Sequence, residues 1–168
     1  DKHRITRREL KEWVRYDPLT GDMRRIRKVV SKTGRFMTID KLITGTNNRG
    51  YRWVNLFGYM YLVHRLAFLY MTGKHPRGEV DHINGDGLDN RRSNLRLATK
   101  SQNQHNCRVR ADNASGYKGV VRKKGKWCAQ IMASNKNKHL GYFNCPTAAH
   151  FAYVKASRAL HGEFGRIA

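Results

Sequence analysis

The pattern of apolar and polar residues near the start of the chain predicts one helix and one strand. Leucine, tryptophan and valine recur at three- and four-residue spacing within residues 2–15, the period of an amphipathic helix. A turn follows, in which Pro18 comes after Asp17 and Gly21 closes the segment. The turn leads into a strand over residues 23–28. Lys and Arg fill the other faces of the helix, where they could contact phosphate or simply face solvent.

The middle of the chain predicts a hairpin followed by a buried helix. Residues 51–56 and 59–63 are rich in aromatic and β-branched side chains on either side of a Phe-Gly turn. Residues 64–71 are apolar enough for a buried helix, which Gly73 should end.

The last third alternates in three short runs and then becomes helical. Strands are expected over residues 117–122, 126–133 and 139–143, and a helix over 147–160 that Gly162 ends. In the middle strand every second residue from the tryptophan onward is apolar. One face of this small sheet should therefore pack on the helix, and the other should face outward.

Between these regions lies a segment with a pattern of strand, loop, strand and helix. β-branched residues predict a strand over 80–83, and the Gly, Asp and Asn residues after it predict turns. Alternation predicts a second strand over 95–97. Thr99 and Gln102 form a capping box, so a helix should begin at Lys100.

Charge sets this segment apart. The chain has 34 Lys and Arg against 12 Asp and Glu, a formal net charge of +22, yet four acidic residues fall between positions 79 and 89. Asp81 on the first strand and Asn103 on the helix can converge on one ion. Their oxygens suit a hard divalent cation, Mg²⁺ or Mn²⁺, which keeps several waters. Adjacent strand residues point to opposite faces, so Asp81 should bind the ion and His82 should activate water as a general base.

These residues resemble the signature of a known nuclease family. Asp81-His82, Asn94 and Asn103 look like the HNH motif, in the variant with Asn in place of the last His that phage homing endonucleases carry. The resemblance implies a ββα-metal fold, one divalent ion at Asp81 and Asn103, and phosphodiester hydrolysis with His82 as base. It also implies that Asn94 orients the loop and the base, and that the products carry 5′-phosphate and 3′-hydroxyl ends. Two upstream runs, Y-D-P-x-T-G and V-H-R-L-A, are similar to the N-terminal part of phage members.

Composition limits the classes of molecule that this protein is expected to bind. So large an excess of positive charge points to a polyanion, and nucleic acid is the expected one. No run has the apolar length of a spanning helix and no signal-peptide pattern opens the chain, so we expect no membrane partner and a cytoplasmic location, that of the bacterial host for a phage protein. The three cysteines are odd in number and lack C-x-x-C spacing, which argues against a disulfide framework and against a structural zinc site.

A second resemblance covers the C-terminal part. Residues 107–115 lack apolar periodicity and predict a linker. The runs G-Y-K-G-V, G-K-W-C-A-Q-I and L-G-Y-F, followed by an Ala-rich helix, look like the Apetala-type domain of plant ethylene-response factors. The resemblance implies a three-stranded sheet laid in the DNA major groove with a helix packed behind it. Val121, Met132 and His139 stand where several plant factors carry Arg or Trp, so the plant target sequence is not expected.

Basic and polar side chains supply the expected DNA contacts. Arg65 could reach a phosphate or form a structural ion pair, and the lysines at the predicted hairpin tip could meet DNA or face solvent. The candidate DNA-binding residues are Arg65, Arg108, Arg110, Lys118, Arg122, Lys123, Lys124, Lys126, Gln130 and His139. His64, in contrast, is expected to be a packed core residue.

These patterns predict an α+β chain of four parts. They are a basic helix over residues 1–15, an HNH nuclease domain with an N-terminal β-rich region and a ββα-metal core over 16–106, the linker, and an Apetala-type domain over 116–164. The expected activity is metal-dependent nicking or cleavage of double-stranded DNA by a monomer or weak dimer, without a small-molecule cofactor. Two alternatives stay open: a DNA-binding regulator with an inactive HNH domain, and a nuclease acting on RNA.

Overall fold

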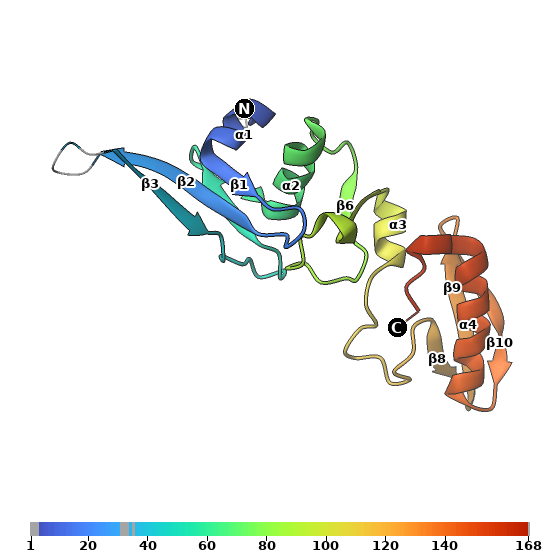
Figure 1. Ribbon diagram of the computed structural model, residues 1–168. Helices are drawn as coiled ribbons and strands as arrows, with labels where there is room; N and C mark the ends of the chain where they lie inside the picture. The colour runs from blue at the N-terminus through green and yellow to red at the C-terminus, as the bar shows by residue number, and fades with distance from the viewer. Residues whose placement is uncertain (1–3, 31–33, 35, 168) are drawn as a thin grey trace. The chain divides into compact units, whose positions relative to one another are not determined.

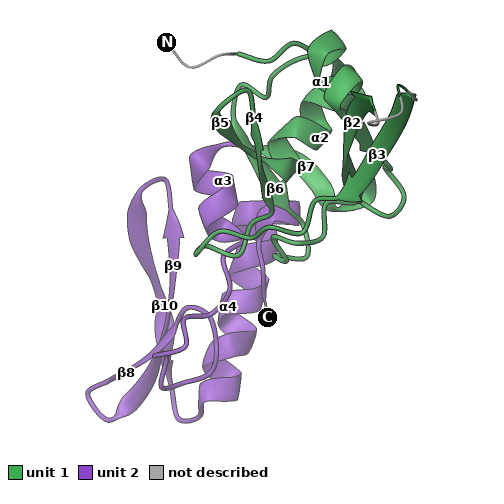
Figure 2. Ribbon diagram, turned by 90° about the vertical axis from the view of Figure 1, so that its left-hand side faces the viewer, with its two compact units in different colours: residues 1–98 green, residues 99–168 purple. Residues whose placement is uncertain are grey.

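The computed structural model describes residues 4–30, 34 and 36–167, which form two compact units, Asp1–Ala98 and Thr99–Ala168 (Figure 2). The first unit contains, in chain order, α1 (Arg7–Trp13), β1 (Val14–Tyr16), β2 (Met23–Val30), β3 (Phe36–Leu42), β4 (Trp53–Leu56), β5 (Tyr59–Leu62), α2 (Val63–Thr72), β6 (Glu79–His82), the 3-10 helix η1 (Arg92–Asn94) and β7 (Leu95–Ala98) (Figure 1). The second unit contains α3 (Lys100–His105), β8 (Val120–Lys123), β9 (Lys126–Ala133), β10 (Lys136–Phe143), α4 (Pro146–His161) and the 3-10 helix η2 (Gly162–Phe164). Helices and several small antiparallel sheets confirm the expected α+β class.

The N-terminal helix is shorter than its pattern predicts. A capping box starts α1: the Thr6 hydroxyl accepts from the Glu9 N–H at 3.2 Å, and the Glu9 carboxylate accepts from the Thr6 N–H at 2.7 Å. The helix ends at Trp13 because the next three residues form β1, which pairs with β2. The predicted helix over residues 2–15 was therefore wrong at its end, where pairing with a distant strand overrides helix propensity. Residues 2 and 3 of that prediction lie outside the described residues.

The β2–β3 hairpin is only half predicted by alternation. β2 extends the predicted strand to Val30, but β3 has no counterpart among the predicted elements. β3 pairs with β2 along its whole length, yet most of its apolar side chains are exposed, with Phe36 at 84 % and Ile39 at 48 %. A strand without a buried face has no alternation by which it could be detected.

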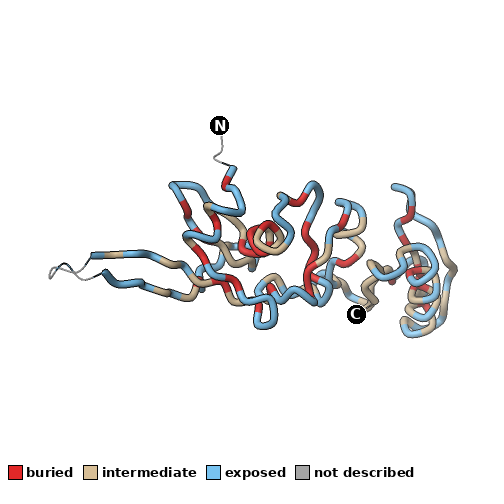
Figure 3. Tube along the Cα trace, turned by 45° about the horizontal axis from the view of Figure 1, so that its top comes forward, coloured by how far each residue is buried: buried red, intermediate tan, exposed pale blue. Residues whose placement is uncertain are grey.

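The core of the first unit is built around α2. Leu66 and Ala67 are buried together with residues of α1 and of the strands, and Figure 3 shows buried positions inside the unit. The helix ends at Thr72 because Gly73 adopts a left-handed φ of 77° and its N–H donates to the Leu69 carbonyl at 2.8 Å. The predicted hairpin and buried helix are confirmed. Neither α2 nor any other helix within the described residues is long and apolar enough to cross a membrane.

The second unit holds a three-stranded antiparallel sheet in the order β10-β9-β8, with α4 packed along it (Figure 2). Trp127 and Ala129 of β9 belong to the same core cluster as Ala149 of α4, which confirms the predicted alternation. The hairpin turn before β10 is made by Ser134 and Asn135, both in the left-handed region. α4 spans one residue more at each end than predicted.

The boundary between the units falls before α3, whereas the nuclease domain was predicted to run through residue 106. One reason is visible in the hydrogen bonds of the second unit. The N–H of Arg166 donates to the carbonyl of His105 at 3.4 Å, so the C-terminal residues contact the end of α3.

Candidate functional site

The β6–β7 hairpin positions the two central residues of the predicted motif. In the antiparallel register Asp81 lies opposite Arg96, and His82 lies opposite Leu95. Adjacent strand residues point to opposite faces, as the sequence predicted. Both Asp81 and His82 are only 4 % exposed, so each needs polar partners inside the unit.

The partner of Asp81 is the guanidinium of Arg96. Nε and Nη2 of Arg96 each lie 2.9 Å from Oδ2 of Asp81, and both side chains are largely buried. Removing one charge of a buried pair leaves the other uncompensated. Arg96 is therefore the charge partner of this buried carboxylate.

His82 is oriented by Asn90, at the end of the loop. Nε2 of His82 lies 3.3 Å from Oδ1 of Asn90, and the Asn90 amide is itself fixed because its Nδ2 donates to the Leu88 carbonyl at 3.1 Å. An amide oxygen only accepts, so Nε2 carries the proton in this contact and the lone pair of the neutral ring lies on Nδ1. Burial lowers the pKa of His82, while the Asn90 contact and nearby carboxylates oppose that change. The ring therefore stays neutral near pH 7, as a base requires.

Two aromatic residues surround His82. The ring centroids of His64 and His82 are 5.0 Å apart in an edge-on arrangement, and Tyr51 lies 5.1 Å from His64 and 5.7 Å from His82. His64 is 5 % exposed, and its buried Nδ1 has no hydrogen-bond partner among the described residues. Burial first, then the neighbouring His82 and Arg65, lowers the pKa of His64 to about 3. His64 is thus a neutral core residue, as expected, but one in contact with the candidate base.

Asn94 holds the loop between the two strands. Its side-chain oxygen accepts from the Asn84 N–H at 2.9 Å, its Nδ2 donates to the Asp89 carbonyl at 2.7 Å, and its own carbonyl accepts from Ile83 at 2.9 Å. Within the loop, the Asp89 carboxylate pairs with Arg91 at 2.6 Å, which lowers the pKa of Asp89 to about 2. One buried amide therefore joins both ends of the loop.

The loop is supported from outside by the turn that follows β1. The hydroxyl of Tyr16 donates to the Asn90 carbonyl at 2.8 Å, and the N–H of Arg92 donates to the Pro18 carbonyl at 2.9 Å. Gly21 has a φ of +78°, and a Cβ there would lie 2.5 Å from the Arg91 nitrogen. Only glycine allows this approach of backbone to backbone. We call these contacts, between residues 16–21 and 90–92, the loop support.

The second predicted metal ligand lies on α3, in the other unit. Asn103 is in the first turns of that helix, whose capping box is present as predicted. Within the described ranges no group of three or more His, Cys, Asp or Glu residues could hold a metal ion. A carboxylate and an amide oxygen nevertheless fit a hard divalent cation, which takes few protein ligands and retains water.

The predicted DNA-binding residues of the sheet divide between its two faces. Cross-strand pairing places Gln130 opposite His139 and Lys123 opposite Lys126, on the face away from the α4 core. Lys123, Lys126 and His139 are exposed. Cys128 was expected on this outward face as well, but it is only 1 % exposed, and its Sγ lies 3.3 Å from Nδ1 of His139, which covers it.

Other predicted DNA contacts are engaged within the protein. The Arg122 guanidinium lies 5.4 Å from the Trp127 ring centroid, and Trp127 is packed in the α4 core. Arg65 donates to the Pro76 and Gly78 carbonyls at 3.2 and 3.1 Å, which is neither an ion pair nor a phosphate contact. Arg110 pairs with Asp112 at 2.8 Å.

Lys118 is also engaged, donating to two backbone carbonyls. Arg108 and Lys124 are exposed. DNA contact by each of these side chains stays a prediction.

The structure adds residues that sequence reasoning missed. Asn90 was expected only to stabilise a turn, yet it is 1 % exposed and orients His82. Tyr51 was not part of any motif. The one available hint for Tyr16 was its position at the start of the Y-D-P-x-T-G run.

Comparisons with known proteins show which family the chain belongs to. Residues 61–105 match a family model described as HNH endonuclease, a segment that includes Asp81, His82, Asn94 and Asn103. Protein 3.8 of Escherichia phage T7 is 32 % identical over 98 residues, which cover 56 % of this chain and 80 % of that protein. No solved structure matches the chain. The chain therefore belongs to the family of phage T7 Protein 3.8 and carries an HNH endonuclease domain at residues 61–105.

Proposed function

We propose that this protein is a metal-dependent DNA endonuclease that hydrolyses phosphodiester bonds, with Asp81, His82 and Asn103 as its metal-binding and catalytic residues. The observation that carries the proposal is the state of His82. It is a buried, neutral imidazole whose orientation is fixed by Asn90, next in sequence to a buried carboxylate that pairs with Arg96, inside the segment that matches HNH endonucleases.

Each residue has a role in the proposed reaction. Nδ1 of His82 accepts the proton of the attacking water. Asp81 and Asn103 would hold one divalent cation, Mg²⁺ or Mn²⁺, which would stabilise the charge on the scissile phosphate and its leaving oxygen. Asn94 keeps the loop closed, so that Asn90 and through it His82 stay in place. The products are 5′-phosphate and 3′-hydroxyl ends.

The C-terminal sheet is proposed to hold double-stranded DNA. Support comes from its three-stranded form with one helix behind it, the arrangement that an Apetala-type domain implies, and from Lys123, Lys126, Gln130 and His139 on the outward face. Exposed Arg108 and Lys124 would add phosphate contacts. If several such side chains neutralise phosphates, affinity should fall about a thousandfold between low and moderately high salt.

Nicking of supercoiled plasmid with Mg²⁺ or Mn²⁺ tests the catalytic roles. Asp81→Asn is the informative variant, because its amide keeps the side-chain volume and an oxygen that can still accept from Arg96, while the charge that would hold the cation is lost. Asp81→Asn should abolish nicking, and His82→Gln should slow it by about 10²- to 10⁴-fold. Glu12→Gln, the same charge change on the exposed face of α1, should nick as wild type does. Nicking by Asp81→Asn at the wild-type rate would refute the assignment.

The same reaction tests the finer parts of the proposal. Nicks with 5′-phosphate and 3′-hydroxyl ends are sealed by DNA ligase without prior end repair, whereas other ends are not. Excess RNA that suppresses plasmid nicking and is itself cut would favour a nuclease acting on RNA. Tight DNA binding with no cleavage under any divalent ion would favour a regulator with an inactive HNH domain.

A further inference from the structure

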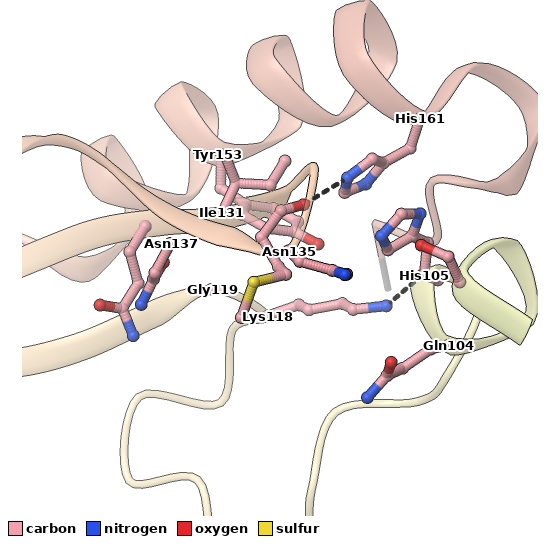
Figure 4. Close-up of a pocket in the computed structure, with 12 residues that line it drawn as sticks. Gln104, His105, Lys118, Gly119, Ile131, Asn135, Asn137, Tyr153 and His161 are labelled. Carbon is pink, nitrogen blue, oxygen red and sulfur yellow. Dashed lines mark hydrogen bonds between the residues drawn. The ribbon is translucent and has the colours of Figure 1, made fainter.

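The C-terminal end of α3 is held by a lysine from another part of the second unit. Nζ of Lys118 lies 2.5 Å from the carbonyl of His105 (Figure 4). It also lies 2.7 Å from the carbonyl of Cys107. The side chain is half-buried, and burial lowers the pKa of Lys118. An ammonium group is stabilising at a helix C-terminus, where carbonyls without helical partners carry partial negative charge.

A second contact holds the same end of α3 through its last side chain. The rings of His105 and His161 stack with centroids 3.6 Å apart and planes 9° from parallel. His161 is in turn fixed to the sheet, because its Nε2 lies 2.7 Å from the Met132 carbonyl (Figure 4). The Arg166 N–H also donates to the His105 carbonyl. We call Lys118, His105 and His161 the α3 clamp.

α3 needs such contacts because little else fixes its position. It has six residues and no buried side chain, and isolated helices shorter than about 12 residues are marginal in water. The capping box at Thr99 and Gln102 secures its N-terminal end, while the clamp secures the other. Asn103 lies between these two points.

The clamp lies largely outside the family match. The HNH match ends at residue 105, so Lys118, Met132 and His161 all belong to the part of the chain beyond it. We propose that Lys118 and His161, by holding the C-terminal end of α3, are positioning residues for the proposed metal ligand Asn103. This inference rests on the proposed function of Asn103. It also gives Lys118 a role other than the DNA contact predicted for it.

The test compares lysine variants of the full chain. Lys118→Met removes the ammonium group and keeps an unbranched side chain, and Lys118→Arg retains a donor. Lys155→Met is the matched control, because Lys155 is exposed on α4 in the same unit and loses the same charge. His161→Ala breaks the clamp from a different element. Each variant is measured by amide hydrogen exchange, by calorimetric titration with Mn²⁺, and by DNA binding in EDTA.

Exchange reads the helix directly and needs no nuclease activity. The Asn103 and Asn106 N–H groups donate to the carbonyls of Thr99 and Gln102. Lys118→Met and His161→Ala should each reduce protection of these two amides about tenfold, the scale of one hydrogen bond to a charged group. Lys118→Arg should restore much of it, and Lys155→Met should change nothing. Mn²⁺ affinity should fall by a similar factor in the same variants.

Two outcomes would overturn the proposal in different ways. If Lys118→Met matches Lys155→Met in amide protection and Mn²⁺ affinity but weakens DNA binding in EDTA more, Lys118 is a DNA contact. If protection falls but Mn²⁺ affinity does not, the clamp stabilises α3 without positioning a metal ligand. Failure of the nuclease proposal is seen separately, because Asp81→Asn then leaves plasmid nicking unchanged.

Discussion

His64 makes the stability of the first unit depend on pH, and the size of the effect can be worked out from its surroundings. The buried ring has a pKa lowered to about 3, against 6.5 for an unperturbed histidine. Below pH 6.5 the unfolded chain takes up a proton that the folded unit does not bind. Stability from this residue is therefore complete at high pH and is lost as pH falls from 6.5 towards 3. Between pH 7 and pH 5 the loss is about 2 kcal/mol.

His64→Phe isolates this contribution. Phenylalanine keeps a ring against Tyr51 and His82 and removes a buried nitrogen that has no partner among the described residues. Stability at pH 7 should therefore change by less than about 1 kcal/mol, since a buried polar atom without a partner is itself unfavourable. The decrease in free energy of unfolding from pH 7 to pH 5 should be smaller by about 2 kcal/mol than in the parent.

Urea unfolding followed by tryptophan fluorescence measures the difference. The chain has three tryptophans, and in a Trp127→Phe background the remaining Trp13 and Trp53 both lie in the first unit. Carboxylates and other histidines also titrate between pH 7 and 5, but they do so in both proteins and cancel in the comparison. Parallel pH profiles for the parent and His64→Phe would show that the buried ring titrates normally, and the reasoning from burial would be wrong.

Two further predictions concern stability. Tyr16→Phe should lower the free energy of unfolding of the first unit by about 1–3 kcal/mol, because the buried Asn90 carbonyl loses its hydrogen-bond donor. Burial raises the pKa of Tyr16 to about 12, so the hydroxyl is protonated and donates in the parent protein. A loss below about 0.5 kcal/mol in the same urea assay would contradict this prediction. Gly119→Ala should cost the second unit about 3 kcal/mol or more by Trp127 fluorescence, because its Cβ would lie 2.1 Å from the Tyr153 ring. Gly125→Ala has a similar φ but open space and should cost about 1 kcal/mol; equal losses would exclude the steric explanation.

Features encoded by neighbouring residues were predicted well from the sequence. Thr99 and Gln102 place the start of α3 at Lys100, and the structure shows both hydrogen bonds of the capping box. The alternation around Trp127 assigned the inner face of β9 correctly. Both signals depend on contacts within a few residues, where the spacing of side chains is fixed by helix or strand geometry.

Features made by distant residues were not predicted. Tyr16 reaches the Asn90 carbonyl across 74 positions, and no local pattern reports such a pairing. Lys118 was predicted to contact DNA because its charge suits phosphate. In the structure its ammonium group donates hydrogen bonds to two backbone carbonyls. Asn90 was treated as a turn residue because asparagine is common in turns. The sequence does not show that Asn90 is buried, and in its buried position the Asn90 side chain contacts and orients His82.

The loop support limits where a truncated form of this protein can begin. A fragment starting at residue 61, where the family match begins, would omit the N-terminal turn on which residues 90–92 rest. Such a fragment would contain every signature residue of the motif. However, Asn90, which orients His82, would lack its contact with Tyr16. An expression clone intended to retain the loop's shape should therefore begin upstream of β1.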